Sequence, residues 1–456
     1  MTCPPLEPQN HPVIQHAPDG VGSPTLEGLP ADLRTAVLLI MPDLATLSRL
    51  VHASPVFHAQ YLLHRKSILF QALLKETTED VFVDVYAAFS SHPSRIGPPT
   101  EPNTNVTDFL SSYLAWRLSC ITPRQIFEKC SFEEIRSMAS FHQSTVSPLA
   151  TQFVCWALAN YRSGPAPRIA QPQPLGGEEE ALTRTEKTRV MRACYRFETL
   201  CHLFCDSHYE KFGRVDINEL IFCNLGLEPW EAEEVCTIYA FVKAKYEEVV
   251  QDVEWDLNEH DPKFDDQDES ELEGLVFPLD EEYDGNFNRH KYYVAGADFL
   301  TGTIAHGGLD LALKMIKAVT HDERLDLMTR SLQAGGDSGD FVEEATDPAT
   351  HVSRRYRQPN DRDRAEERDQ AMSFAGDDAG APPLAWTLLW GGRYSNLFGG
   401  YVPDELRRWG YVLWDARRID VDGARGYLKG LWATSPELML VCRQWAWMSD
   451  RPRYLD

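Results

Sequence analysis

Apolar residues in the first 75 positions recur at helical spacing in three consecutive segments. In the first segment, four apolar residues lie at i, i+3, i+4 and i+7, the spacing of one helix face: Leu33, Ala36, Val37 and Ile40. The second segment carries Leu44, Leu47, Leu50 and Val51 on one face, and the third carries Phe57, Tyr61, Ile68 and Ala72. The pattern predicts three short amphipathic helices between residues 26 and 75.

Proline and capping residues mark the ends of these helices. Pro30 suits a first helical turn, because the N–H that proline lacks is not needed there. Pro42 ends the first helix, since the residue before a proline is biased out of the α region, and Asp43 can cap the second. Ser54 and Pro55 together start the third helix in the same way.

Three further leucines, Leu38, Leu39 and Leu63, lie outside these apolar faces. Short helices gain most of their stability by packing an apolar face. Because these leucines add apolar surface beyond what one bundle face needs, the segment is typical of a helical motif that binds a partner.

The rest of the chain also has mostly helical periodicity. Helices are predicted within residues 106–161, over 184–212, and from Pro229 onward, and strand alternation is rare. The expected fold is therefore mostly α: a three-helix module at 26–75, followed by an irregular all-helical domain at 106–456. Seven of the eleven tryptophans lie in residues 384–456, where they predict a core or a pocket.

Four segments interrupt this pattern. A disordered tail is expected at 1–25, and a Gly- and Pro-rich linker at 163–183. Residues 252–284 contain fifteen acids and one base, Lys263, which predicts a solvated acidic loop. A polar stretch without periodicity predicts a flexible insert at 333–383.

Composition and charge narrow the function classes. The 456-residue chain carries 44 Lys and Arg against 69 Asp and Glu, a formal net charge of −25, which disfavours binding to nucleic acid or to an anionic membrane surface. Ten cysteines without paired spacing indicate a reducing compartment. No secretory signal and no membrane-spanning run is found, so the expected location is intracellular, in the cytoplasm or the nucleus.

The N-terminal segment resembles an F-box. Leu29, Pro30, Asp32 and Leu33 match the family's opening; Pro42, Asp43 and Leu44 match its turn; Leu50 and Val51 match its end. The turn is shorter than the family's usual one, and Phe57 is the nearest aromatic where the family often has tryptophan. The Ser-Pro-x-Phe continuation at 54–57 resembles a variant common in large fungal families.

The resemblance implies an adaptor without catalytic activity. Such a module docks on a Skp-type adaptor within a cullin-RING ubiquitin ligase, and the rest of the chain recruits an unknown target protein. Carried over by position, the adaptor-binding set is Leu29, Pro30, Leu33, Pro42, Leu44, Leu50 and Val51.

Other motifs give weak support for chemistry. Cys194, Cys201, Cys205 and His208 share a helix face, where core packing is a simpler interpretation than a zinc site. A partial Ca²⁺-loop pattern starts at Asp280, a Gly-Asp-Ser-Gly string lies at 336–339, and arginines alternate with acids at 354–369. None is complete, so no metal, cofactor or catalytic residue is predicted.

Two alternatives to the adaptor stay open. In one, the protein is a non-enzymatic structural or regulatory interaction protein whose N-terminal helices are part of the core. In the other, it is an enzyme whose site is assembled from residues distant in sequence, which no motif supports. Burial of the 29–51 apolar positions distinguishes the first alternative from the adaptor.

Overall fold

The computed structural model describes residues 25–97, 104–119, 121–163, 182–204, 227–257, 261–262, 303–331, 372–391, 402–421 and 423–434. Within these residues, 81% are helical and none is in a strand. The prediction of a mostly α fold is therefore confirmed.

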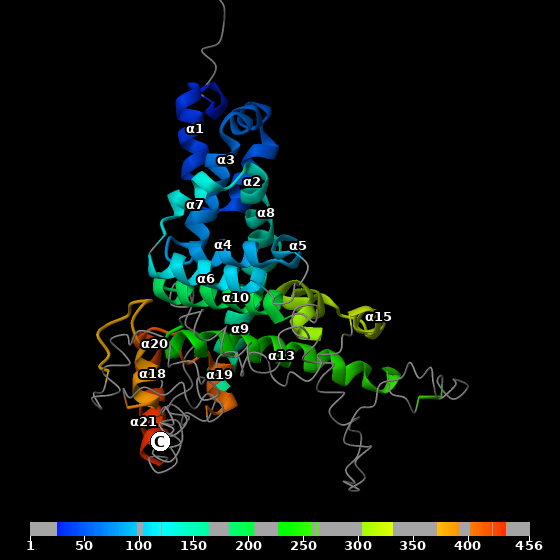
Figure 1. Ribbon diagram of the computed structural model, residues 1–456, viewed down its shortest axis with the longest axis vertical. Coiled ribbons are helices and arrows are strands. Elements are labelled where there is room, and N and C mark those ends of the chain that lie inside the picture. Colours follow the sequence, from blue (N-terminus) through cyan, green and yellow to red (C-terminus); the bar gives the residue numbers. More distant parts are fainter. Residues whose placement is uncertain are drawn as a thin grey trace, which may run out of the picture.

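The N-terminal helices occupy one end of an elongated molecule (Figure 1). They are the 3₁₀ turn η1 (Leu26–Gly28), α1 (Ala31–Ile40), α2 (Leu44–Ala53) and α3 (Pro55–Thr77). The expected caps form, because the Asp43 side chain accepts from the Thr46 N–H at 2.6 Å and the Ser54 hydroxyl accepts from the Phe57 N–H at 3.3 Å. The three predicted helices are confirmed, and α3 bends at His64.

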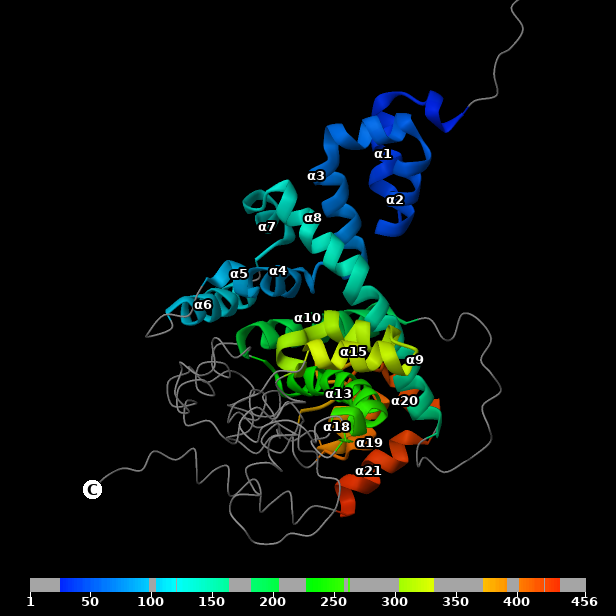
Figure 2. The same cartoon turned by 90° about the vertical axis from the view of Figure 1, so that its right-hand side faces the viewer.

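A second group of helices connects this end to the remainder of the molecule. It comprises α4 (Phe82–Ser91), α5 (Pro93–Ile96), α6 (Thr104–Leu118), α7 (Pro123–Lys129), α8 (Phe132–Phe141), the π-helical turn η2 (His142–Val146) and α9 (Ser147–Ser163). Thr122 and Ser131 start α7 and α8 with full capping boxes. Figure 2 shows α8 and α9 as a long rod that runs from the side of α3 past α10.

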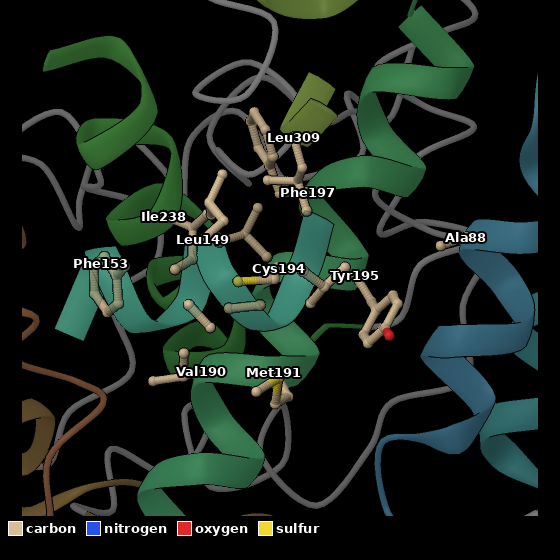
Figure 3. Close-up of a cluster of buried hydrophobic side chains, with 14 of the residues drawn as sticks. Ala88, Leu149, Phe153, Val190, Met191, Cys194, Tyr195, Phe197, Ile238 and Leu309 are labelled. Atoms are coloured by element: carbon tan, nitrogen blue, oxygen red, sulfur yellow. The ribbon is translucent and has the colours of Figure 1, made fainter. Parts of the chain in front are cut away.

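The middle of the molecule is built around α10 (Arg184–Phe204), which lies between α4 on one side and α13 (Pro229–Leu257) on the other (Figure 1). A helix at 303–317 and α15 (His321–Ser331) pack beside them. Figure 3 shows apolar side chains of α10 among those of its neighbours: Ala88 of α4, Leu149 and Phe153 of α9, and Ile238 of α13.

The sequence predicts core packing for the face of α10 that carries Cys194 and Cys201, and the structure buries both faces of this helix. Val190, Cys194 and Phe197 enter the hydrophobic core. The polar face is buried as well, because its arginines form ion pairs with acids of neighbouring helices. Arg192 is bidentate to Glu234, with both distances 2.6 Å.

The last described helices close the opposite end of the molecule (Figure 1). They are α18 (Leu384–Leu389), α19 (Asp404–Trp409), α20 (Ala416–Val421) and α21 (Ala424–Thr434). Four of the C-terminal tryptophans are 0–2% exposed and belong to the core: Trp386, Trp390, Trp409 and Trp414. The side chains of the other three lie outside the described residues.

Several predicted boundaries are corrected. The division into 26–75 and 106–456 omits α4, which packs closely on α10 and belongs to the body. The first six residues of the predicted acidic loop, 252–257, are the last turns of α13, with Val253 buried. The last residues of the predicted flexible insert, 372–383, belong to the described structure, and Pro382 and Pro383 are buried there. Residues 1–24, most of the linker, 263–284 and 333–371 lie outside the described residues.

Candidate docking surface and cavity

The predicted adaptor-binding residues fall into three groups by burial. Pro30, Leu33 and Pro42 are exposed. Leu29 and Leu50 are half-buried. Leu44 and Val51 lie in the hydrophobic core, at 3% and 6% exposure. The structure therefore leaves five of the seven at least partly accessible and uses the other two for packing.

The buried side of α1 lies opposite to the apolar face that the sequence identified on this helix. Leu38, predicted to lie outside the main face, is 1% exposed and packs in the core with half-buried Leu39. Leu33 and Ile40, which lie on the apolar face identified in the sequence, are 51% and 68% exposed. Because α1 is apolar on more than one side, its periodicity did not identify the side that meets α3.

Exposed apolar side chains concentrate in this part of the molecule. Of the eight large hydrophobic residues that the described chain exposes, five lie between residues 26 and 63: Leu26, Leu33, Ile40, Leu62 and Leu63. Single exposed leucines are ordinary on protein surfaces, whereas several in one small module are characteristic of an interaction site.

The turn between α1 and α2 is held at both ends by two consecutive residues of α3. The Lys75 ammonium donates to the carbonyls of Leu39 and Met41 at the end of α1, at 2.6 and 3.1 Å. The Glu76 carboxylate accepts from the Leu44 N–H at the start of α2. Each charge matches the partial charge of the helix end it meets, so the pair stabilises the turn.

Asp43 contributes a further interaction to the same turn. Its hydrogen bond from the Thr46 N–H holds the pKa of the Asp43 carboxyl below its ordinary value. Sequence reasoning identified the Asp43 cap but missed Lys75 and Glu76. No local pattern could have revealed them, since they lie more than 30 positions from the groups they bind.

A cavity of about 640 Å³ lies between α4, α5, α8, α10 and the helix at 303–317. Its apolar lining includes Val85, Met138 and the ring of Tyr195. Exposed Arg95 also lines it, with its guanidinium stacked on Phe89 and paired with Glu134 at 2.6 Å. A cavity of this size and composition can take an apolar side chain of a ligand or a peptide.

Ser91, His202 and Glu198 lie beside the cavity and have the residue types of a Ser-His-acid catalytic triad, but not its accessibility. The Ser91 hydroxyl lies 3.0 Å from His202 Nδ1, and His202 Nε2 lies 3.4 Å from Glu198. Ser91 is 0% exposed and its hydroxyl also donates to the Ala88 carbonyl. The hydroxyl is therefore not presented to a substrate as hydrolysis would require.

The cysteine face of α10 behaves as core in its described part. Cys194 and Cys201 are buried, and burial raises the pKa of the Cys194 thiol to about 12. Cys205 and His208, like the motifs at 280–285, 336–339 and 354–369, lie outside the described residues. The described residues contain no cluster of three potential metal ligands, and none of their helices is long and apolar enough to cross a membrane.

Comparison with known proteins gives no match to this chain, whether with family models, curated proteins or solved structures. The function of this protein is therefore inferred from the residues and the geometry described above.

Proposed function

We propose that this protein is a substrate-recruiting adaptor of a cullin-RING ubiquitin ligase, intracellular and without catalytic activity of its own. In this proposal, the module at 26–75 binds a Skp-type adaptor, and the helical body that begins at α4 recruits a target protein. The observation that carries it is the concentration of exposed apolar side chains on a module whose sequence resembles an F-box.

The structure refines which residues would meet the adaptor. Leu44 and Val51 stabilise the module itself, because they are buried against α3 and the core. Contact with a partner would fall to Pro30, Leu33 and Ile40, which lie in the open. Covering the exposed parts of Leu33 and Ile40 would contribute about 1–2 kcal/mol each before the cost of association.

The test is a binding measurement with a purified Skp-type adaptor. A Leu33→Glu/Ile40→Glu variant should fold normally, because both positions are exposed, yet lose affinity on the order of 100-fold, because a charge would be buried in an apolar interface. Leu118→Glu is the matched control, since Leu118 is 76% exposed on α6, outside the module. Wild-type binding by the double variant, or no binding by the wild type, would refute the proposal.

One observation favours the second candidate, a structural or regulatory interaction protein. Leu38, Leu44 and Phe57 belong to the same contiguous hydrophobic cluster as the core of the body. On this interpretation the N-terminal helices serve mainly as part of the core. A wild-type protein that captures no Skp-type adaptor, but unfolds when residues 26–54 are removed, would favour it.

A further inference from the structure

A buried histidine of the body is hydrogen-bonded to the N-terminal module. His142 is 0% exposed and begins the π-helical turn η2. Its Nε2 lies 3.0 Å from Oε2 of Glu76 on α3, and its Nδ1 lies 2.8 Å from the hydroxyl of Tyr195 on α10. The other carboxylate oxygen of Glu76 accepts from the Leu44 N–H of α2. An unbroken chain of hydrogen bonds therefore links α10 to the start of α2.

The proton positions in this chain follow from its chemistry. Burial, and the nearby Cys194 and Glu76, raise the pKa of the Tyr195 phenol well above its ordinary value, so the phenol keeps its proton beside Nδ1. A carboxylate can only accept, so Nε2 of His142 donates to Glu76. Both ring nitrogens of the buried histidine therefore have a hydrogen-bond partner.

The carboxylate at the centre is held in its charged form. Burial by itself would raise the pKa of Glu76, but hydrogen bonds from His142 and from the Leu44 N–H, with the Lys187 charge on α10, lower it. A charged Glu76 is the form that best caps α2, because the N-terminus of a helix carries a partial positive charge. His142 thus fixes both the position and the charge of the cap.

The π-helical turn places His142 at this junction. A π turn inserts an extra residue into an α-helix, and such insertions are frequent at functional sites. Here the turn joins α8, which packs on α3, to α9, which packs on α10. The described part of α2 has its main contacts with α3 alone, so the chain through His142 provides it with a specific polar connection to the body.

We propose that His142 is a positioning residue, which fixes the orientation of the α1–α2 hairpin relative to the body by holding Glu76 against the first turn of α2. The consequence for adaptor binding rests on the proposed function, since Leu33 and Ile40 lie on that hairpin. The positioning itself does not rest on the proposed function, because it can be measured without any partner.

Amide hydrogen exchange on the full chain tests the positioning directly. In His142→Leu, which removes both hydrogen bonds, we expect exchange at the first turn of α2, residues 44–46, to rise at least 10-fold. His142→Gln keeps a donor for Glu76 and should restore most of the protection. His202→Leu is the control, because His202 is a half-buried histidine of α10 that bonds to Ser91 and not to the module.

A second variant keeps the test decisive if His142→Leu does not fold. Tyr195→Phe keeps the ring and removes only the hydroxyl that is bonded to Nδ1, so it should raise exchange at residues 44–46 by a smaller factor. Unchanged exchange there, or an increase spread evenly over the chain, would overturn the inference.

Adaptor affinity, measured in parallel, should fall with His142→Leu and recover with His142→Gln. Failure of the wild type to bind would count against the proposed function alone.

Discussion

Replacing Arg196 by methionine tests whether the buried charges around α10 hold the body together. Arg196 is 6% exposed and donates to Asp84 of α4 at 3.1 Å and to Glu231 of α13 at 2.9 Å. It therefore joins the two helices that flank α10. Methionine has a similar length and removes the charge without leaving a large cavity.

The expected loss follows from the acids that stay behind. Glu231 keeps Arg117, at 2.9 Å, and Arg192, at 3.6 Å, whereas Asp84 keeps only a hydrogen bond from the Tyr113 hydroxyl among its described partners. Removing one member of a buried pair costs about 3–5 kcal/mol, because an uncompensated charge stays buried. We expect Arg196→Met to lower the free energy of unfolding by an amount in that range, and Tm on the order of 5–10 °C.

The pH dependence of unfolding gives an independent measurement. Burial would raise the pKa of Glu231, but Arg196, Arg117 and Arg192 hold it well below its ordinary 4.5. A carboxyl with a lowered pKa adds stability above its unfolded value, and this stability is lost as the pH falls toward the folded value. Without Arg196 the folded value rises, so the variant should gain less stability between acidic and neutral pH.

Urea unfolding followed by circular dichroism, repeated at several pH values, measures both effects. Arg124→Met is the control, because Arg124 pairs with Glu128 at 3.2 Å with both side chains largely in water, where such a pair adds little. A second change, Arg196→Met with Asp84→Asn, should recover part of the loss by removing the orphaned charge. If Arg196→Met is as stable as Arg124→Met, the buried network does not hold the helices together.

Three further outcomes are expected. Leu38→Ala should cost about 2–5 kcal/mol of unfolding free energy and Leu33→Ala far less, because only Leu38 is buried; equal melting temperatures would contradict the orientation of α1. Gly308→Ala should lower Tm, since Gly308 has φ +51° and an added Cβ would lie 2.5 Å from a buried glutamate oxygen; an unchanged Tm would argue against this backbone conformation. In the native protein, iodoacetamide should label exposed Cys155 and spare Cys194, whose pKa burial raises to about 12; mass spectrometry of the labelled peptides would show the reverse if α10 were accessible.

The accuracy of the sequence-based predictions depended on how local each feature is. Helix starts at Asp43, Ser54 and Pro229 were predicted correctly, because a cap or a first-turn proline acts within one turn. The predicted acidic loop was wrong over 252–257, where buried Val253 and an ion pair between Asp252 and Arg324 extend α13. Charge density alone did not show that Arg324, 72 positions away, would donate a hydrogen bond to Asp252.

The candidate docking surface was partly predictable. The sequence indicated an N-terminal module with surplus apolar residues, and five of its seven predicted contact residues are at least partly accessible. It misassigned Leu38, which was expected to be surplus apolar surface and is buried, because a helix with apolar residues on several sides can turn any of them toward its neighbour, and only packing on α3 selected one.

The amino-acid sequence by itself determined the helical class and the helix starts marked by a cap or a first-turn proline, such as those at Asp43, Ser54 and Pro229, since these follow from periodicity and from contacts within a few residues. Tertiary structure decided which faces are buried, the pairing of the arginines of α10, and the chain from Tyr195 through His142 to the cap of α2. These features join residues tens to more than a hundred positions apart, and no local pattern specifies such a partner. A buried charge or imidazole acquires its role only when folding removes water and brings its counterpart within hydrogen-bonding distance.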